Sequence, residues 1–449
     1  MGALASPRPR LRHGAHAVRG PRAVRAARPG RATRGAQFLV LLAALAVAGP
    51  ARAAGWSATA VFDRATCSPA DRCVTEPAPR VAVNAKGQAV AAWIDTQDRA
   101  RVAVAARPGR FGAAVTLGKS GLRPSPAIAP DGTVTVVWEQ HEALVFARAR
   151  DGKFGPAQPL APKTKREDGD AHAAAQADGS VAVVYESNGD IRAVTLSPQG
   201  VPAAPVTLGQ GGFGHNSVRA AADGTLTACC ITPVNNDPNV PPDLAPKVAV
   251  HRGAWKLVSA PDLGEDGEIE TVFANAQQLI LGVIDVRSSG DASSSGIPGF
   301  SLDGAVPVFA RVSKPTRGLA PDVAIDGSGR SVLVYGEKTG PKAFSREAPV
   351  YASIAGGPGR RLTSAQGYEP TVRPLGPGAI AVWQLPGAKW GVAVERDGAF
   401  RTVAAPRGPG PRRYLGEDFH YAYDLAANGT RAVLTWVAAD GSIRVSERS

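Results

Sequence analysis

The sequence predicts an all-β fold, a β-propeller of four-stranded blades, and three observations predict it. A unit of short apolar runs joined by tight turns recurs at intervals of 45 to 54 residues. The turn and the aromatic residue that ends the following run keep a nearly constant separation. No segment carries the apolar stripe of a helix. Four short strands per repeat at such a period are typical of propeller blades, and an array of β-sandwiches is the alternative.

The repeat is clearest from Pro126 to Trp138, where Asp131-Gly132 separates two apolar runs. Asp-Gly between such runs predicts a tight primed turn, because glycine adopts positive φ at little cost. A third run over residues 144–150 and a fourth over residues 153–160 complete four strands, here named A to D.

Eight copies of the unit are present. Their A–B turn positions are Gly87, Gly132, Gly179, Gly224, Gln278, Gly329, Gly378 and Gly429. The Trp and Tyr residues that end strand B recur at one position, which indicates packing between blades. The copy around Gln278 lacks the turn glycine, so seven blades remain the alternative to eight.

The two ends of the chain fit a closed ring. The last repeat has strands A, B and C but no D, and residues 56–62 form an orphan strand that resembles the other D strands. We expect residues 56–62 to complete the last blade, so that no open end blade is left to pair with other chains.

Residues 1–53 are expected to be a secretory signal with a long Arg-rich n-region, and residues 54–449 a single propeller domain. An apolar run over residues 38–49 precedes Ala51-Arg52-Ala53, a cleavage site that predicts processing near Ala53. The run is too short for a permanent membrane anchor. The length of the Arg-rich n-region leaves open whether the start codon is correctly assigned. We therefore expect a bacterial protein that is secreted, extracellular or in the cell envelope.

The positive charge lies mostly in that segment. The chain has 51 basic and 38 acidic residues, and removing ten Arg and no acid leaves 41 − 38 = +3. A nearly neutral mature chain gives no support for nucleic-acid binding.

The four cysteines fall into two pairs. In an exported protein, Cys67 and Cys73, six residues apart, are expected to form a disulfide beside the orphan strand. Cys229 and Cys230 are adjacent at the end of a B strand, where alternation sends them to opposite faces. The sequence leaves their state open, and two small buried side chains are the simpler interpretation.

Carboxylates that follow strand B are the first candidate site. They are Asp95, Glu139, Glu186, Asp285 and Glu337. They should approach the face that carries the B–C loops, where acids can bind a cation or act as general acids. Ordinary solvated strand ends are the alternative. The densest titratable cluster makes Glu139, His141 and Glu186 the catalytic candidates, and Asp95, Asp285, Glu337, Tyr368 and Trp390 the ligand-binding candidates.

Three long B–C loops point to the same face. They span residues 232–246, 285–295 and 336–346, and insertions on one face of a repeat ring often mark the binding face. No metal spacing, Walker loop, dinucleotide fingerprint or nucleophile elbow is present, so we expect no metal and no cofactor.

The C–D turns read A-R-A-R-D-G-K-F, V-E-R-D-G-A-F and A-A-R-P-G-R-F. This layout resembles sialidase-like bacterial propellers with Asp-box (BNR) repeats, which carry S-x-D-x-G-x-T-W at that turn. The Ser and the T-W ending are missing here. Sialidases also use an arginine cluster opened by an F-R-I-P-like segment, whose nearest match is Leu122-Arg123-Pro124. No catalytic role is carried across.

The sequence thus predicts a monomeric binding or interaction module whose partner is a carbohydrate or an extracellular protein. A sialidase-like hydrolase or lyase acting on glycans, with its site on the face of the long loops, is the alternative. A structural envelope protein is a third possibility. The sequence does not identify the ligand.

Overall fold

The structure is a computed structural model. The chain divides into two compact units, Met1–Arg52 and Ala53–Ser449. The structure describes residues 55–64, 79–119, 121–141, 143–161, 171–210, 217–221, 223–231, 247–259, 267–275, 278–285, 298–301, 310–311, 318–337, 348–411 and 423–449. Residues 1–53, expected to be a signal, and the pair Cys67 and Cys73 lie outside the described residues, as do nearly all residues of the three long loops.

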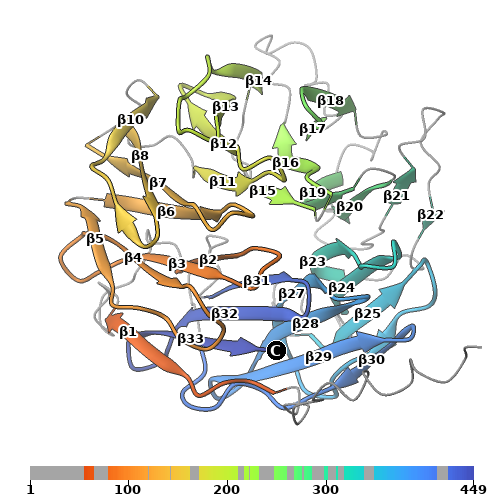
Figure 1. Ribbon diagram of the computed structural model, residues 1–449. Coiled ribbons are helices and arrows are strands. Elements are labelled where there is room, and N and C mark those ends of the chain that lie inside the picture. Colours follow the sequence, from red (N-terminus) through yellow and green to blue (C-terminus); the bar gives the residue numbers. More distant parts are fainter. Residues whose placement is uncertain are drawn as a thin grey trace, which may run out of the picture. The chain divides into compact units, whose positions relative to one another are not determined.

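The described residues form strands and turns, which confirms the all-β prediction (Figure 1). They build eight antiparallel sheets, which we number along the chain. Sheet 1 consists of β2 (Arg80–Val83), β3 (Ala89–Ile94), β4 (Ala100–Ala105) and β5 (Val115–Gly118), and sheet 2 of β6 (Gly121–Ile128), β7 (Val134–Gln140), β8 (Ala143–Arg150), β9 (Lys153–Phe154) and β10 (Gln158–Ala161). Sheet 3 consists of β11 (His172–Ala175), β12 (Val181–Ser187), β13 (Asp190–Leu196) and β14 (Val206–Gln210). Sheet 4 consists of β15 (Ser217–Ala220), β16 (Leu226–Ile231), β17 (Lys247–His251) and β18 (Trp255–Ser259).

The remaining four sheets follow the same order. Sheet 5 consists of β19 (Gly267–Ala274), β20 (Gln278–Asp285), β21 (Pro298–Ser301) and β22 (Ala310–Arg311), and sheet 6 of β23 (Gly318–Ile325), β24 (Ser331–Glu337), β25 (Val350–Ile354) and β26 (Arg360–Arg361). Sheet 7 consists of β27 (Tyr368–Leu375), β28 (Gly378–Leu385), β29 (Lys389–Arg396) and β30 (Ala399–Thr402). Sheet 8 consists of β31 (Tyr423–Asn428), β32 (Arg431–Val437) and β33 (Ser442–Arg448) together with β1 (Ala60–Arg64). The copy without a turn glycine is sheet 5, so it too forms four strands.

The eighth sheet joins the two ends of the second unit. Strand β1 pairs antiparallel with β33, and an isolated bridge joins Trp56 to Arg448 (Figure 1). The pairing lies at residues 60–64 with a register shift after Val61, whereas the sequence placed the strand at residues 56–62. Phe62 stacks on Trp93 of sheet 1 at 5.0 Å between ring centroids, so the N-terminal strand ties sheet 8 to sheet 1.

The first strands of successive sheets contact one another. These contacts join β2 to β6, β6 to β11, β11 to β15, β15 to β19, β19 to β23, β23 to β27, β27 to β31 and β31 to β2. The aromatics that end the second strands are almost fully buried and fill the interfaces between sheets, as predicted: Trp93, Trp138, Tyr185, Trp383 and Trp436.

The turn between β6 and β7 differs from the predicted two-residue primed turn. The Ala129 N–H donates to Thr133 O and the Gly132 N–H to Ala129 O, both at 2.9 Å, which closes a three-residue loop. Only Gly132, at φ 94°, has positive φ in this loop, as expected for a hairpin with a bulge. The two-residue primed turn occurs instead at Asp151-Gly152, between β8 and β9, where both residues have positive φ.

Candidate functional site

One polar position recurs in the first strands and sets the geometry of the candidate site. Counting back seven residues from the turn position gives a polar residue in seven of the eight repeats: Arg80, Ser125, His172, Ser217, Thr271, Asp322 and Thr371. In sheet 8 the turn is shorter, and Asp424 pairs with Thr435, just before Trp436. Asp322 likewise pairs with Val334, just before Tyr335, so the two acids occupy the same register.

Several of these side chains bind the next sheet. Asp424 Oδ2 accepts the Val81 N–H of sheet 1 at 2.9 Å. Ser125 Oγ accepts the Ala173 N–H of sheet 3, also at 2.9 Å. Because first strands of different sheets do not share a ladder, these bonds satisfy partly buried N–H groups that would otherwise cost free energy.

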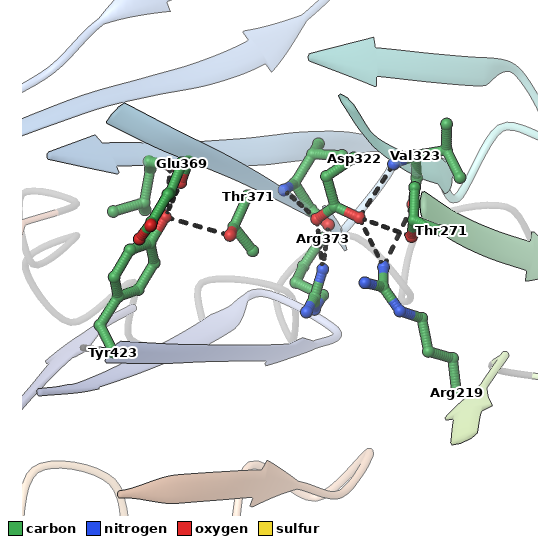
Figure 2. A network of polar contacts seen from close by, with 10 residues as sticks. Arg219, Thr271, Asp322, Val323, Glu369, Thr371, Arg373 and Tyr423 are labelled. Carbon is green, nitrogen blue, oxygen red and sulfur yellow. Dashed lines mark hydrogen bonds and ion pairs between the residues drawn. The ribbon is translucent and has the colours of Figure 1, made fainter. Parts of the chain in front are cut away.

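Asp322 is the centre of the largest network, which we call the Asp322 cluster: Arg219, Thr271, Asp322 and Arg373. These residues come from β15, β19, β23 and β27, so four sheets meet at one carboxylate (Figure 2). Arg219 Nη1 and Arg373 Nη1 each lie 2.8 Å from a carboxylate oxygen, and Thr271 Oγ1 donates at 3.0 Å. The backbone N–H groups of Val323 and Val372 also donate to it, at 3.0 and 2.9 Å.

The surroundings keep Asp322 ionised. Burial alone would raise the pKa of its carboxyl, but the charges of Arg219 and Arg373 and the hydrogen bonds outweigh burial, so the pKa lies below its ordinary value. The Asp322 side chain is 7 % exposed, whereas those of Arg219 and Arg373 are 18 % and 20 % exposed. One carboxylate thus holds two guanidinium groups that still reach solvent.

A second contact extends this network toward sheet 8. Thr371 Oγ1 lies 3.0 Å from the Tyr423 hydroxyl, which donates to the Glu369 carbonyl oxygen (Figure 2). Tyr423 also packs edge-on against Trp390 at 5.0 Å between ring centroids. The polar contacts therefore lie directly beside the aromatic core of sheets 7 and 8.

Asp95 is buried rather than solvated. It is 1 % exposed and accepts the backbone N–H groups of Gln97 and Arg99 at 2.9 and 3.1 Å. Arg99 and Arg101 pair with its second oxygen at 2.7 and 3.0 Å. Burial raises its pKa, but the hydrogen bonds from Arg99 and Gln97 and then from Arg101 outweigh burial and lower it. Asp95 thus organises the turn between β3 and β4.

The catalytic candidates Glu139 and His141 lie at one strand end. Glu139 is 5 % exposed, and its Oε1 lies 4.0 Å from Arg123 Nη1. Arg123 is the arginine of the segment that resembles F-R-I-P. His141 is exposed in the turn after β7, with φ 49°.

The other candidates are spread over several sheets. Glu186 is half-buried in β12, and Tyr368 is half-buried at the start of β27. Asp285 and Glu337 end β20 and β24, but their side chains lie outside what the structure describes. The side chains of Cys229 and Cys230 in β16 lie outside it as well.

Trp390 does not lie on a rim. Its side chain is 7 % exposed, and its ring packs edge-on against Trp436 at 5.7 Å as well as against Tyr423. A ring enclosed on these sides presents no face on which a sugar could stack, so this candidate does not fit the structure.

Sequence reasoning missed Arg219, Asp322 and Arg373. The available signal was the polar residue at a fixed offset before each turn glycine. That offset would have pointed to Asp322 and Thr271, but not to Arg219 and Arg373, which lie two residues after the repeat position of their strands. No group of three or more His, Cys, Asp or Glu side chains suited to a metal occurs in the described ranges.

No family model and no curated protein matches the chain. Among solved structures, the WD40 domain of SCAP from fission yeast is 12 % identical, with 84 % of this chain and 96 % of that chain covered and a TM-score of 0.49. The BP39L lectin from Burkholderia pseudomallei is 12 % identical, with 74 % and 100 % covered and a TM-score of 0.43.

A structure from a study of two prolyl endopeptidases is also similar, at 12 % identity and a TM-score of 0.47. The match covers 82 % of this chain but about half, 55 %, of that chain. Proteins similar to this chain thus include both binding domains and an enzyme, and they assign it no function.

Proposed function

We propose that this protein is a binding module that recognises an acidic ligand, such as a carboxylated or sulfated glycan, at the Asp322 cluster. The observation that carries the proposal is that one buried carboxylate orients two guanidinium groups, both of which remain partly exposed. Arginine binds planar oxyanions through paired N–H donors, and a guanidinium that is already oriented loses less entropy on binding. Both contacts from Arg373 to its described partners use Nη1, so its Nε and Nη2 edge can face a ligand.

A binding role fits the acids better than acid–base catalysis does. A general acid at neutral pH needs a raised pKa, which burial away from cations provides. Asp95 and Asp322 are buried, but their arginine partners lower their pKa values. Both carboxylates therefore stay ionised and act as scaffolds for arginines.

We propose further that the eight sheets are the blades of a closed propeller. Support comes from the unbroken series of contacts between first strands, which returns from β31 to β2, and from the pairing of β1 with β33. In such a ring the first strands surround the axis, so the Asp322 cluster would face a central channel. Export through residues 1–53 would place the ligand outside the cytoplasm.

The test is a glycan-array screen of the purified protein with sulfated, uronate-containing, sialylated and neutral glycans. We expect binding to acidic glycans that weakens as salt is raised, with no turnover. The Arg373→Met variant should bind at least about tenfold more weakly, since a charge-assisted hydrogen bond contributes about 1.5–3 kcal/mol.

The matched control is Arg360→Met, because Arg360 is an exposed arginine of β26. Thermal melting would establish that both variants fold. Preference for neutral glycans, or equal binding by wild type and Arg373→Met, would contradict the proposed site. Turnover of a bound glycan would replace the binding module with the glycan-acting enzyme.

A further inference from the structure

Arg448 is a buried arginine without a partner in the described part of the chain. It lies near the end of β33, is 5 % exposed, and its Nη1 is enclosed with no acceptor. Arg431 of β32 is 4 % exposed, and its guanidinium nitrogens also lack a hydrogen bond in the described part of the chain, but it has a counterion, Glu447, at 2.5 Å. Burying a charge without a counterion costs several kcal/mol of free energy. Arg448 therefore differs from Arg431 in having no described counterion.

Trp56 places a second enclosed donor beside it. Trp56 and Arg448 are bridge partners on neighbouring strands, so their side chains project from the same face of the sheet. The indole of Trp56 packs against the apolar cluster that contains Val394 and Trp436. Its Nε1–H is enclosed and has no acceptor among the described residues. A buried indole N–H is usually hydrogen-bonded.

A third cationic group comes from sheet 7. Arg396 ends β29, whose Val394 belongs to the same apolar cluster as Trp56. Burial, and then the positive charge of Arg396, lower the pKa of Arg448. Two guanidinium groups within electrostatic range of each other, with no carboxylate paired to Arg448 in the described ranges, repel unless an anion lies between them.

We propose that Arg448, Trp56 and Arg396, here called the Arg448 site, bind an oxyanion group such as a carboxylate, sulfate or phosphate. The ligand oxygens accept from the Arg448 guanidinium and the Trp56 indole, and the exposed Arg396 contributes positive charge. This site is separate from the Asp322 cluster. Arg448 pairs with Ala432, at the start of β32. The position in sheet 8 that corresponds to Asp322 is Asp424, and it pairs with Thr435, near the other end of β32.

The experiment is thermal melting of the full chain during titration with sodium phosphate, sodium sulfate or sodium acetate at constant ionic strength. Wild type should be stabilised in a saturable way, as for a ligand that binds only the folded state. Arg448→Met should lose that stabilisation and, without added anion, melt at the same temperature as wild type or higher. The three salts distinguish a tetrahedral from a carboxylate ligand.

Two further variants keep the test decisive if Arg448→Met fails to fold. Arg396→Met removes an exposed charge, and Trp56→Phe keeps an aromatic ring but removes the indole N–H. Each should raise the apparent Kd for the stabilising anion at least about threefold to tenfold, and Arg360→Met should leave it unchanged. Equal shifts in wild type and in all variants, or no saturable shift with any salt, would overturn the proposal.

Discussion

The Asp322 cluster and the environment of Arg448 are two solutions to the burial of charge in one chain. Asp322 accepts from two arginines, one hydroxyl and two backbone N–H groups, and it joins four sheets. Arg448 is almost as deeply buried but has no described partner. The fold therefore provides ion-pair and hydrogen-bond partners for a buried charge at Asp322, where these contacts join neighbouring sheets. We infer that Arg448 is kept for a ligand.

Asp322 and Arg448 differ in whether a described residue of opposite charge pairs with them, and not in burial. Asp95 belongs with Asp322, since its oxygens accept from two backbone N–H groups and two arginines of its own sheet. Arg373 is intermediate, because it pairs with Asp322 and remains partly exposed.

The largest expected effect is from Asp322→Ala. Removing the carboxylate leaves Arg219 and Arg373 facing each other and strips the Val372 N–H of its acceptor. The free energy of unfolding should fall by about 3–5 kcal/mol, as for a broken buried ion pair. Chemical denaturation measures this loss, with the exposed turn residue Asp131→Ala as the control, expected to lose about 1 kcal/mol or less. Similar losses in both variants would mean that the cluster is no more than a surface ion pair.

The next effect is on the pH dependence of stability. The folded pKa values of Asp95 and Asp322 lie below the unfolded value of about 3.9. Stability from these groups is fully present above that unfolded value and is lost as pH falls through the lower folded values. Unfolding followed between about pH 5 and pH 2 should show a steep loss for wild type and a shallower one for Asp322→Asn. Parallel curves would show that Asp322 is not preferentially ionised in the folded state.

A smaller effect is expected from Ser125→Ala. The Ala173 N–H would lose its acceptor, and an unsatisfied buried donor costs about 1–3 kcal/mol. Ser125→Thr, which keeps the hydroxyl, is the matched variant and should lose less. If denaturation gave equal losses for both substitutions, the bond between sheets 2 and 3 would not account for the effect.

The smallest effect is predicted for Thr271→Val, which removes one of the five bonds to Asp322 at nearly constant volume. The loss should be about 1 kcal/mol, because both arginines stay in place. In an Asp322→Ala background the same change should cost almost nothing, so a double-mutant cycle measures the coupling directly. Additive losses would exclude a shared network.

The repeat could be predicted because residues close together in the sequence specify it. Glycine at the A–B turn and an aromatic six residues later, as at Gly132 and Trp138, specify a hairpin with one buried end. The exact turn could not be derived, because a three-residue loop and a primed turn both favour glycine. The pairing of the N-terminal strand was foreseen from the missing last strand, but its position at residues 60–64 depends on a register shift that has no local signal.

The candidate site could be predicted only in part. The carboxylates Asp95 and Glu139 were recognised from their position at the end of strand B. The sequence does not show that both are buried, or that arginines lie beside them. Asp322, Arg219 and Arg373 are about fifty residues or more apart, so only the contacts between sheets bring them together. Trp390 resembled a surface aromatic because its burial depends on Trp436 and Tyr423 of the next sheet.

The comparison is tested most directly by the unfolding midpoints of wild type, Asp322→Ala and Arg448→Met, each measured with and without sodium phosphate at constant ionic strength. We predict a large loss for Asp322→Ala in both buffers. Arg448→Met should lose nothing without phosphate and should gain less from phosphate than wild type does. A loss for Arg448→Met as large as that for Asp322→Ala, with the same response to phosphate as wild type, would contradict the account.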